Sequence, residues 1–307
     1  MYSSDAPAGK RVARRWNCKR GKGVESSVPV RKIHKTAVFF LAYVATTAAW
    51  GDACSLDWVC VRPTDHADGR ADFTAENLRD YPVTISVRMR ARNLQAHGPN
   101  PVTVTVPPNE SLVVMKANKR DENRSTWYRY NFDWTVGDKD AVHDDAVVYR
   151  LPYAPGKRYG VLQGYGSRFS HTGLERYTID FNMPVGTPVH AARGGVVARV
   201  VEQHDKGCWS DGCGAYANFL VVLHDDSTTG EYYHLKKDGV LVAEGDRVEA
   251  GQLIALSGNT GHTTMPHLHF GVYRAASWGA TESVPVRFNS SNGVVTTPRR
   301  GRGYLAR

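Results

Sequence analysis

Two histidines separated by one residue stand in the short apolar segment "TMPHLHFGV", residues 264–272. Alternate residues of a β-strand point to the same face, so His267 and His269 would project side by side while Leu268 and Phe270 pack on the opposite face. Two neighbouring imidazoles suit half of a metal site, or one metal ligand beside a proton-transfer group. The alternative is a pair of structural histidines in an ordinary strand.

The upstream segment "FSHTGLERYTIDFNMPVGTPV" offers a further histidine, His171, and a carboxylate, Asp180. Together with one of the paired histidines, these residues make a set of two imidazoles and one carboxylate. Such a set leaves a fourth zinc position open for water, as catalytic zinc sites do. The sequence has no HExxH motif to supply a glutamate base, whereas "EYYHL" adds another histidine, His234.

Residues 160–275 carry, in order, "SHTG", "YTIDF", "VGTPVHAARGGVV", "YYHL" and "VEAGQLIALSGNTGHTTMPHLHF". This ordered set resembles the lysostaphin-type (LytM-type) zinc endopeptidases, which cut peptide bonds in bacterial peptidoglycan. The resemblance implies one Zn²⁺ per chain, bound by His171, Asp180 and His269. It also implies that His234 and His267 stay off the metal and act on the water and the developing oxyanion, for which the ordinary pKa of histidine is suitable.

The spacing of the first two ligands departs from that family. Most members have H-x3-D, whereas eight residues separate His171 from Asp180 here. Glu175 lies where the usual spacing would put a carboxylate and is therefore a competing ligand. Asp180 is preferred, because "IDFNMPVGTPV" matches the family around its ligand. The residues between would form a small loop or hairpin.

Three further residues are candidates for lining a peptide groove: Asn218, Tyr233 and His262. A tyrosine in a β-rich core needs no such role, and a histidine in the Gly-rich turn "GNTGHTTMP" is otherwise an exposed loop residue. The segment from Gly207 to Gly214 is long enough to form one wall of the groove.

Alternating apolar and polar residues in short segments, such as "VTISVRMRA", predict a β-sandwich domain over residues 54–152. Residues 153–280 predict a second, antiparallel β-domain. Two of its phrases, "VGTPVHAARGGVVARVV" and "EGDRVEAGQLIALSG", echo each other and suggest a pseudo-duplicated architecture. The expected class is therefore all-β, with a catalytic domain of the lysostaphin-type, duplicated hybrid motif kind.

Residues 1–53 combine a basic segment with an apolar stretch, Ala37 to Ala49, followed by small residues. This layout predicts an export signal cleaved between Ala48 and Ala53, and the stretch is too short to span a bilayer comfortably. We therefore expect no stable membrane span after signal removal. A buried core helix is the alternative.

Removal of the signal leaves four cysteines in two close pairs. In an exported chain they predict the disulfides Cys54–Cys60 and Cys208–Cys213, although four cysteines permit three pairings. A zinc site is the rival interpretation for the second pair, but one C-x4-C supplies only half a tetrahedral shell. These features favour a periplasmic or extracellular location.

The net charge of +9 is concentrated at the two ends. Residues 1–36 contain ten lysines and arginines, and the predicted C-terminal basic tail, residues 281–307, ends in a segment with four arginines. The part between is slightly acidic, which argues against nucleic-acid binding by the folded domains.

The sequence thus predicts an exported zinc metalloendopeptidase, expected to be a monomer, whose partners are peptidoglycan peptides. The alternative function is a catalytically silent, peptidoglycan-binding regulator of other wall hydrolases.

Overall fold

The structure, a computed structural model, describes residues 54–307. The predicted basic segment and export signal, residues 1–53, lie outside the described residues. From Cys54 onward the chain forms β-strands joined by loops, with two short 3-10 helices and no α-helix, so the predicted all-β class is confirmed. None of the helices in the described range is long and apolar enough to cross a membrane.

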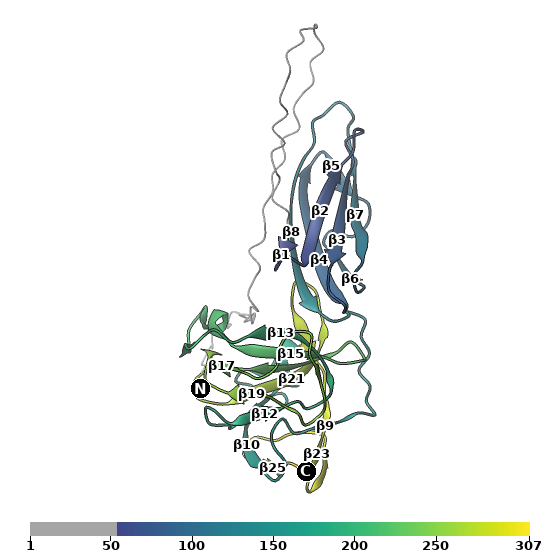
Figure 1. The fold of residues 1–307 in the computed structure, drawn as a ribbon. Coiled ribbons are helices and arrows are strands. Elements are labelled where there is room, and N and C mark those ends of the chain that lie inside the picture. Colours follow the sequence, from purple (N-terminus) through teal and green to yellow (C-terminus); the bar gives the residue numbers. More distant parts are fainter. Residues whose placement is uncertain (1–53) are drawn as a thin grey trace, which may run out of the picture.

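Two sheets form the N-terminal β-sandwich (Figure 1), one of five strands in the order β1-β2-β3-β7-β5 and one of three in the order β6-β4-β8. Their bounds are β1 Cys54–Ser55, β2 Val59–Asp65, β3 Ala71–Asn77, β4 Val83–Arg92, β5 Leu94–Ala96, β6 Val102–Val106, β7 Ser111–Lys119 and β8 Trp127–Val136. In β3 buried and half-buried residues alternate strictly, as expected for a strand with one face in the core.

Strand β4 departs from this alternation. Its predicted inward residues, such as Val83 and Ile85, are fully buried, but Thr84 and Ser86 on the opposite face are buried as well. The second domain covers part of that face: the main-chain N–H of Trp278 donates to Ser86 Oγ at 2.8 Å, and the Arg88 guanidinium lies over the Trp278 ring. The alternation of residues within one strand does not reveal a contact with another domain.

The second domain is built on a nine-stranded sheet in the order β18-β13-β15-β16-β21-β11-β10-β25, with β22 paired to β21. The bounds are β10 Arg158–Gln163, β11 Ile179–Phe181, β13 Gly195–Val201, β15 Phe219–Leu223, β16 Thr229–Tyr233, β18 Arg247–Val248, β21 Leu268–Ala275, β22 Thr281–Ser283 and β25 Gly303–Leu305. All the pairings in this sheet are antiparallel.

Smaller elements complete this domain. They are the sheet β12 (Pro188–His190), β19 (Leu253–Ser257) and β17 (Leu235–Val240); the parallel pair β14 (Gly207–Cys208) and β20 (Gly261–His262); the sheet β24 (Gly293–Val295), β23 (Arg287–Ser290) and β9 (Val148–Arg150); and the 3-10 helices η1 (Gly173–Glu175) and η2 (Cys213–Tyr216). Side chains from β12 and β19 pack with one face of the large sheet in a single core, which includes Val189, Ile254 and Phe270.

The opposite face of the large sheet meets the sandwich (Figure 1). Phe219, Val221 and Leu223 of β15 belong to the same hydrophobic cluster as the sandwich core. The Tyr81 hydroxyl donates to the Ala198 carbonyl at 2.9 Å across this junction. The two domains are therefore joined by a buried apolar contact as well as by the linker.

The C-terminal residues differ from the predicted basic tail. Strand β22 pairs with β21, and β25 pairs with β10, so residues 281–307 complete the second domain. Ala306 is buried, and the Tyr153 hydroxyl donates to the Tyr304 carbonyl at 2.7 Å. The short apolar segments between the arginines form edge strands. The basic net charge comes from exposed side chains and therefore did not indicate these strands.

Candidate metal centre

Two predicted ligands are neighbours across a pair of antiparallel strands. Asp180 of β11 stands directly opposite His269 of β21, and Asp180 Oδ1 lies 2.7 Å from His269 Nδ1. The residues on either side, such as Ile179 and Phe270, enter the apolar core on the opposite face. The two-residue period of the strands therefore buries the apolar residues and directs both ligands to the other face.

His171 reaches the same carboxylate from the loop before η1. Its Nε2 lies 3.2 Å from Asp180 Oδ1, and its side chain is fully buried. Its Nδ1 lies 3.3 Å from the Gly164 carbonyl oxygen, which fixes the ring orientation. Candidate ligand atoms of His171, Asp180 and His269 all lie within 4.8 Å of one another.

The charges of this cluster suit a divalent cation. Burial alone would raise the pKa of Asp180, but hydrogen bonds from His171 and His269 hold it well below its usual range, so the carboxylate is ionised. A third imidazole nitrogen, His267 Nε2, lies 3.6 Å from the same Oδ1 atom. Several nitrogen donors thus surround one buried oxygen, and two imidazoles with one carboxylate are a donor set that Zn²⁺ accepts.

His234 and His267 lie beside this cluster, with ring centroids 4.5 Å apart. In each ring Nδ1 lies 2.7 Å from a main-chain carbonyl oxygen, that of Thr260 for His234 and that of Met265 for His267. We assign the ring proton to Nδ1, which leaves Nε2 as the basic nitrogen. Burial lowers the pKa of both histidines, so both are neutral near pH 7 and able to accept a proton.

His267 lies just outside the strand that was expected to contain it, and His234 also lies just outside a strand. Strand β21 begins at Leu268, one residue after His267, and β16 ends at Tyr233, one residue before His234. His234 has a left-handed backbone with φ of 64°. This turn directs its ring toward His267, which continued strand geometry would not do.

The three predicted groove residues occupy different environments. Asn218 is fully buried, and its amide donates to the main-chain oxygens of His204 and Leu235. Tyr233 is half-buried, and its hydroxyl donates to Glu231 Oε2 at 2.6 Å. His262 is half-buried, and its ring packs on Trp209 with centroids 4.1 Å apart. Tyr233 and His262 are therefore partly accessible, whereas the bonds of Asn218 give it a structural position.

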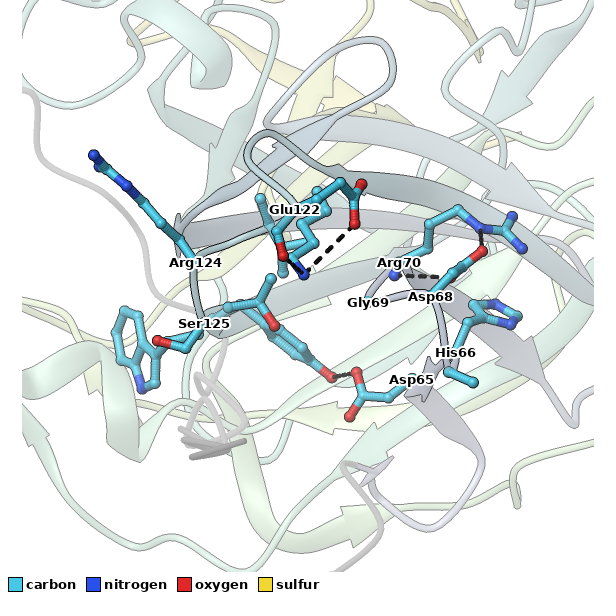
Figure 2. A pocket seen from close by; sticks show the side chains of 14 residues that line it. Asp65, His66, Asp68, Gly69, Arg70, Glu122, Arg124 and Ser125 are labelled. Carbon is cyan, nitrogen blue, oxygen red and sulfur yellow. Dashed lines mark hydrogen bonds and ion pairs between the residues drawn. The ribbon is translucent and has the colours of Figure 1, made fainter. Parts of the chain in front are cut away.

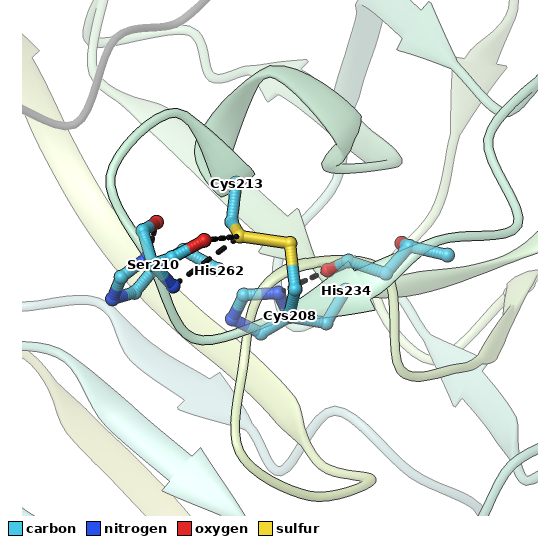
Figure 3. The surroundings of a disulfide bond; sticks show 6 residues. Cys208, Ser210, Cys213, His234 and His262 are labelled. Atoms are coloured by element: carbon cyan, nitrogen blue, oxygen red, sulfur yellow. Dashed lines mark hydrogen bonds between the residues drawn. A yellow bond between two sulfur atoms is a disulfide. The ribbon is translucent and has the colours of Figure 1, made fainter.

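The loop predicted as a groove wall is closed by the disulfide Cys208–Cys213. Figure 3 shows this disulfide beside His262 and His234. The loop is joined to the segment before His267 by the pairing of β14 with β20 and by His262 Nδ1, which lies 3.1 Å from the Ser210 carbonyl oxygen. Trp209 stacks on Phe169, which precedes His171 by two residues, and both rings are exposed. The other predicted disulfide, Cys54–Cys60, is also present and joins β1 to β2.

Three polar residues of this region were missed by the sequence analysis. Gln163 of β10 donates from Nε2 to Asp180 Oδ2 at 2.6 Å. Tyr273 and Glu231 are buried on the same face of the sheet as His269. Each takes its place through pairing between strands that are distant in sequence. For Tyr273 a sequence signal did exist: the period-two pattern of "HLHFGVY" indicates that Tyr273 lies on the same face of the strand as His269.

A separate cavity of about 390 Å³ lies in the sandwich, between the β2–β3 turn and the β7–β8 loop (Figure 2). Its charged groups bind one another, the main chain or a tyrosine hydroxyl. Arg70 Nε donates to Asp68 Oδ2, Tyr128 to Asp65 Oδ1, and Lys119 Nζ to the Glu122 carbonyl. These contacts give the cavity no converging set of reactive groups.

Comparison with known proteins points to one family. Residues 175–283 match the sequence profile described as Peptidase family M23. The match begins after His171, within the long spacing between the first two candidate ligands.

Curated relatives include peptidoglycan DD-endopeptidase ShyA of Vibrio cholerae, 41% identical over 122 residues, which are 38% of this chain and 26% of ShyA. Lysostaphin of Staphylococcus simulans is 33% identical over 169 residues, 52% of this chain and 31% of lysostaphin. Glycyl-glycine endopeptidase ALE-1 of Staphylococcus capitis is 38% identical over 146 residues, 46% of this chain and 37% of ALE-1. The chain thus spans about a quarter to two fifths of the length of these relatives.

Proposed function

We propose that the chain is a member of peptidase family M23, whose profile matches residues 175–283, and that it is an exported zinc metalloendopeptidase that hydrolyses peptide bonds in peptidoglycan stems or cross-links. The observation that carries the proposal is the convergence of His171, Asp180 and His269 within 4.8 Å, with two neutral imidazoles beside them. The relatives named above as endopeptidases support the substrate class. The two disulfides support an oxidising compartment.

In this proposal His171, Asp180 and His269 hold one Zn²⁺. When bound, zinc supplies Lewis-acid polarisation of a carbonyl and makes a water molecule acidic near neutral pH. Asp180 contributes the negative charge of the ligand set, and Gln163 fixes the second oxygen of that carboxylate by its 2.6 Å hydrogen bond. The Gly164 carbonyl orients His171 in the same way.

His234 and His267 take the proton-transfer roles. Each has its Nδ1 held by a main-chain carbonyl, so its Nε2 is the atom that accepts a proton. The histidine that accepts the proton of the attacking water becomes an imidazolium. It can then donate a hydrogen bond to the developing oxyanion or return the proton to the leaving amine. Burial keeps both rings neutral and therefore able to accept a proton, while the charge of Asp180 favours the imidazolium form of each ring.

The test is digestion of defined muropeptides by the purified protein, with mass-spectrometric identification of the products. The digestion is performed with the protein as isolated, with a zinc chelator, and after zinc is restored. We expect peptide-bond cleavage that the chelator abolishes and zinc restores, together with one zinc per chain by elemental analysis. A protein that binds peptidoglycan but contains no stoichiometric zinc and releases no peptides would instead be a silent regulator.

A further inference from the structure

The two ring nitrogens of His269 face different groups. Nδ1 lies 2.7 Å from Asp180 Oδ1, within the cluster of candidate ligand atoms. Nε2 lies 3.4 Å from the Tyr273 hydroxyl and 3.7 Å from Glu175 Oε2. If His269 binds a cation beside Asp180, Nδ1 is the ligand atom, and Nε2 points to Tyr273 and Glu175.

Tyr273 and Glu175 are joined to each other. The Tyr273 hydroxyl donates to Glu175 Oε2 at 2.8 Å, so its oxygen can accept a hydrogen bond from Nε2 of His269. Tyr273 is buried, and it follows His269 by four residues on the same face of β21. A hydrogen-bond chain therefore runs from the imidazole, through the phenol, to a carboxylate.

The long spacing between the first two candidate ligands is what places Glu175 here. Glu175 ends η1, and its main-chain oxygen accepts a hydrogen bond from Thr178 Oγ1 at 2.8 Å. The main-chain N–H of Tyr177 donates to Ser283 Oγ of β22 at 2.9 Å, and the Arg176 carbonyl accepts from Gly166 N–H at 2.7 Å. The loop between His171 and Asp180 is thus attached at several points, and Glu175 is held in position.

A histidine can bind a metal only through a nitrogen without a proton, so binding through Nδ1 requires the ring proton on Nε2. Asp180 alone would favour the opposite tautomer, because a proton on Nδ1 could be donated to its carboxylate at 2.7 Å. We infer that Glu175, acting through the Tyr273 hydroxyl, is a positioning residue that keeps the ring proton of His269 on Nε2 and Nδ1 available for zinc. This inference rests on the proposed function, since it takes Zn²⁺ as the ion bound.

The inference gives Glu175 a role different from direct ligation. His171 has a main-chain carbonyl as its outer partner, whereas His269 has a tyrosine and a carboxylate. Partners of this kind orient metal-binding histidines, and their loss typically weakens metal binding by about 10- to 100-fold.

The test measures the zinc affinity of the full chain by competition with a chromophoric chelator. The variants are Tyr273→Phe, Glu175→Ala and Glu175→Gln. Glu282→Gln is the matched control, because this glutamate lies in the neighbouring β22 but pairs with the exposed Arg274. We expect about 10- to 100-fold weaker binding for Tyr273→Phe and Glu175→Ala. A smaller loss is expected for Glu175→Gln, whose amide oxygen still accepts from the phenol, and no change for Glu282→Gln.

A second readout separates positioning from a general structural effect. In the zinc-loaded protein, nitrogen-15 spectra of the imidazoles should show a slowly exchanging Nε2–H of His269. Glu175→Ala should accelerate its exchange with solvent and Tyr273→Phe should do the same, whereas the His171 ring should be unchanged. Near-UV circular dichroism checks that each variant is folded. If Tyr273→Phe fails to fold, the two Glu175 variants still test the inference, because Glu175 lies in a loop at the surface.

Three results would overturn the inference. Unchanged zinc affinity in Tyr273→Phe and Glu175→Ala would remove the positioning role while leaving the proposed function intact. Complete loss of zinc in Glu175→Ala with retention in Asp180→Asn would make Glu175 a direct ligand. Absence of zinc binding by the unaltered protein would contradict the proposed function and this inference with it.

Discussion

Asp180 and His269 face each other across two adjacent antiparallel strands, with 2.7 Å between Oδ1 and Nδ1. Because the same strands also bury Ile179 and Phe270, the strand register that forms the core also sets the spacing of these two candidate ligands. The arrangement depends on strand pairing, which loop motion does not easily alter.

Asp180→Asn is expected to abolish stoichiometric zinc binding and to lower the rate of muropeptide cleavage at least about 100-fold. Two neutral imidazoles alone bind zinc weakly, and the site loses its negative charge. Elemental analysis after dialysis measures the first effect and product release the second. Asp225→Asn, at an exposed aspartate, should retain both properties. A full equivalent of zinc in Asp180→Asn would show that the ligand set is wrong.

His267→Ala and His234→Ala are expected to keep zinc and lose turnover by about 10²- to 10⁴-fold, the range typical of a missing proton-transfer group. Both rings are turned so that a main-chain carbonyl holds Nδ1, which assigns Nε2 to proton transfer. The measurement is zinc content and cleavage rate on the same preparations. If His267→Ala abolished zinc binding, His267 would have to be reassigned as a ligand.

Glu231 should make the stability of the metal-free protein depend on pH. Burial raises its pKa to about 7, although hydrogen bonds from Tyr233 and Thr229 oppose the rise. The folded protein therefore holds this proton more tightly than the unfolded chain. The stabilisation is fully present below the ordinary glutamate pKa of about 4.3 and is lost as the pH rises through about 7, a total of about 4 kcal/mol.

Glu231→Gln should remove this component, so that its free energy of unfolding falls less than that of the unaltered protein between pH 4.5 and 8. Urea unfolding of both proteins in chelator, across this pH range, measures the difference. Glu249→Gln, at an exposed position, is the matched control. Parallel pH profiles for Glu231→Gln and the unaltered protein would contradict the assigned pKa.

Replacing Cys208 and Cys213 together by serine is expected to lower turnover several-fold while zinc content is kept. The reason is that this loop is bonded to residues 261–263, which follow directly on the carbonyl of Thr260 that holds His234. The loss of stability should be about 2 kcal/mol, because the disulfide closes a short loop. Cleavage rate, zinc content and unfolding free energy are measured together.

The double serine variant of Cys54 and Cys60 is the control for this prediction, since that disulfide lies in the sandwich. It should lose a similar free energy of unfolding with an unchanged cleavage rate. Equal cleavage rates for both double variants and the unaltered protein would show that the Cys208–Cys213 loop does not influence the site.

Residue types and short-range spacing were sufficient to predict the all-β class and both disulfides, whereas the set of side chains that gather in the cluster was chosen with the help of the family resemblance. His267 and His269 stand two apart in a strand-like segment, and such local periodicity can be read directly from a sequence. The structure brings His171, Asp180 and His269 together as expected, while their roles stay proposals.

Other features depend on contacts that no local pattern encodes. Gln163 is bonded to Asp180 because β10 pairs with β11, and the Ser86 face of β4 is buried because the second domain covers it. The C-terminal strands were not predicted, because the many arginines in this segment lie on the solvent-facing side of edge strands and suggested an exposed tail. The left-handed turn at His234 also had no signal, since the residue is not a glycine.

One row of side chains crosses four strands of the large sheet, from Phe219 through Tyr233 and His269 to Asp180. Phe219 belongs to the hydrophobic cluster of the sandwich and Tyr233 packs against it, so this cluster reaches the strand next to that of His269. Among the described residues, no side chain of β11 or β10 belongs to that cluster, so we expect a substrate to approach His269 from their side of the sheet. In the proposed enzyme the sandwich would thereby limit the directions from which a substrate can approach.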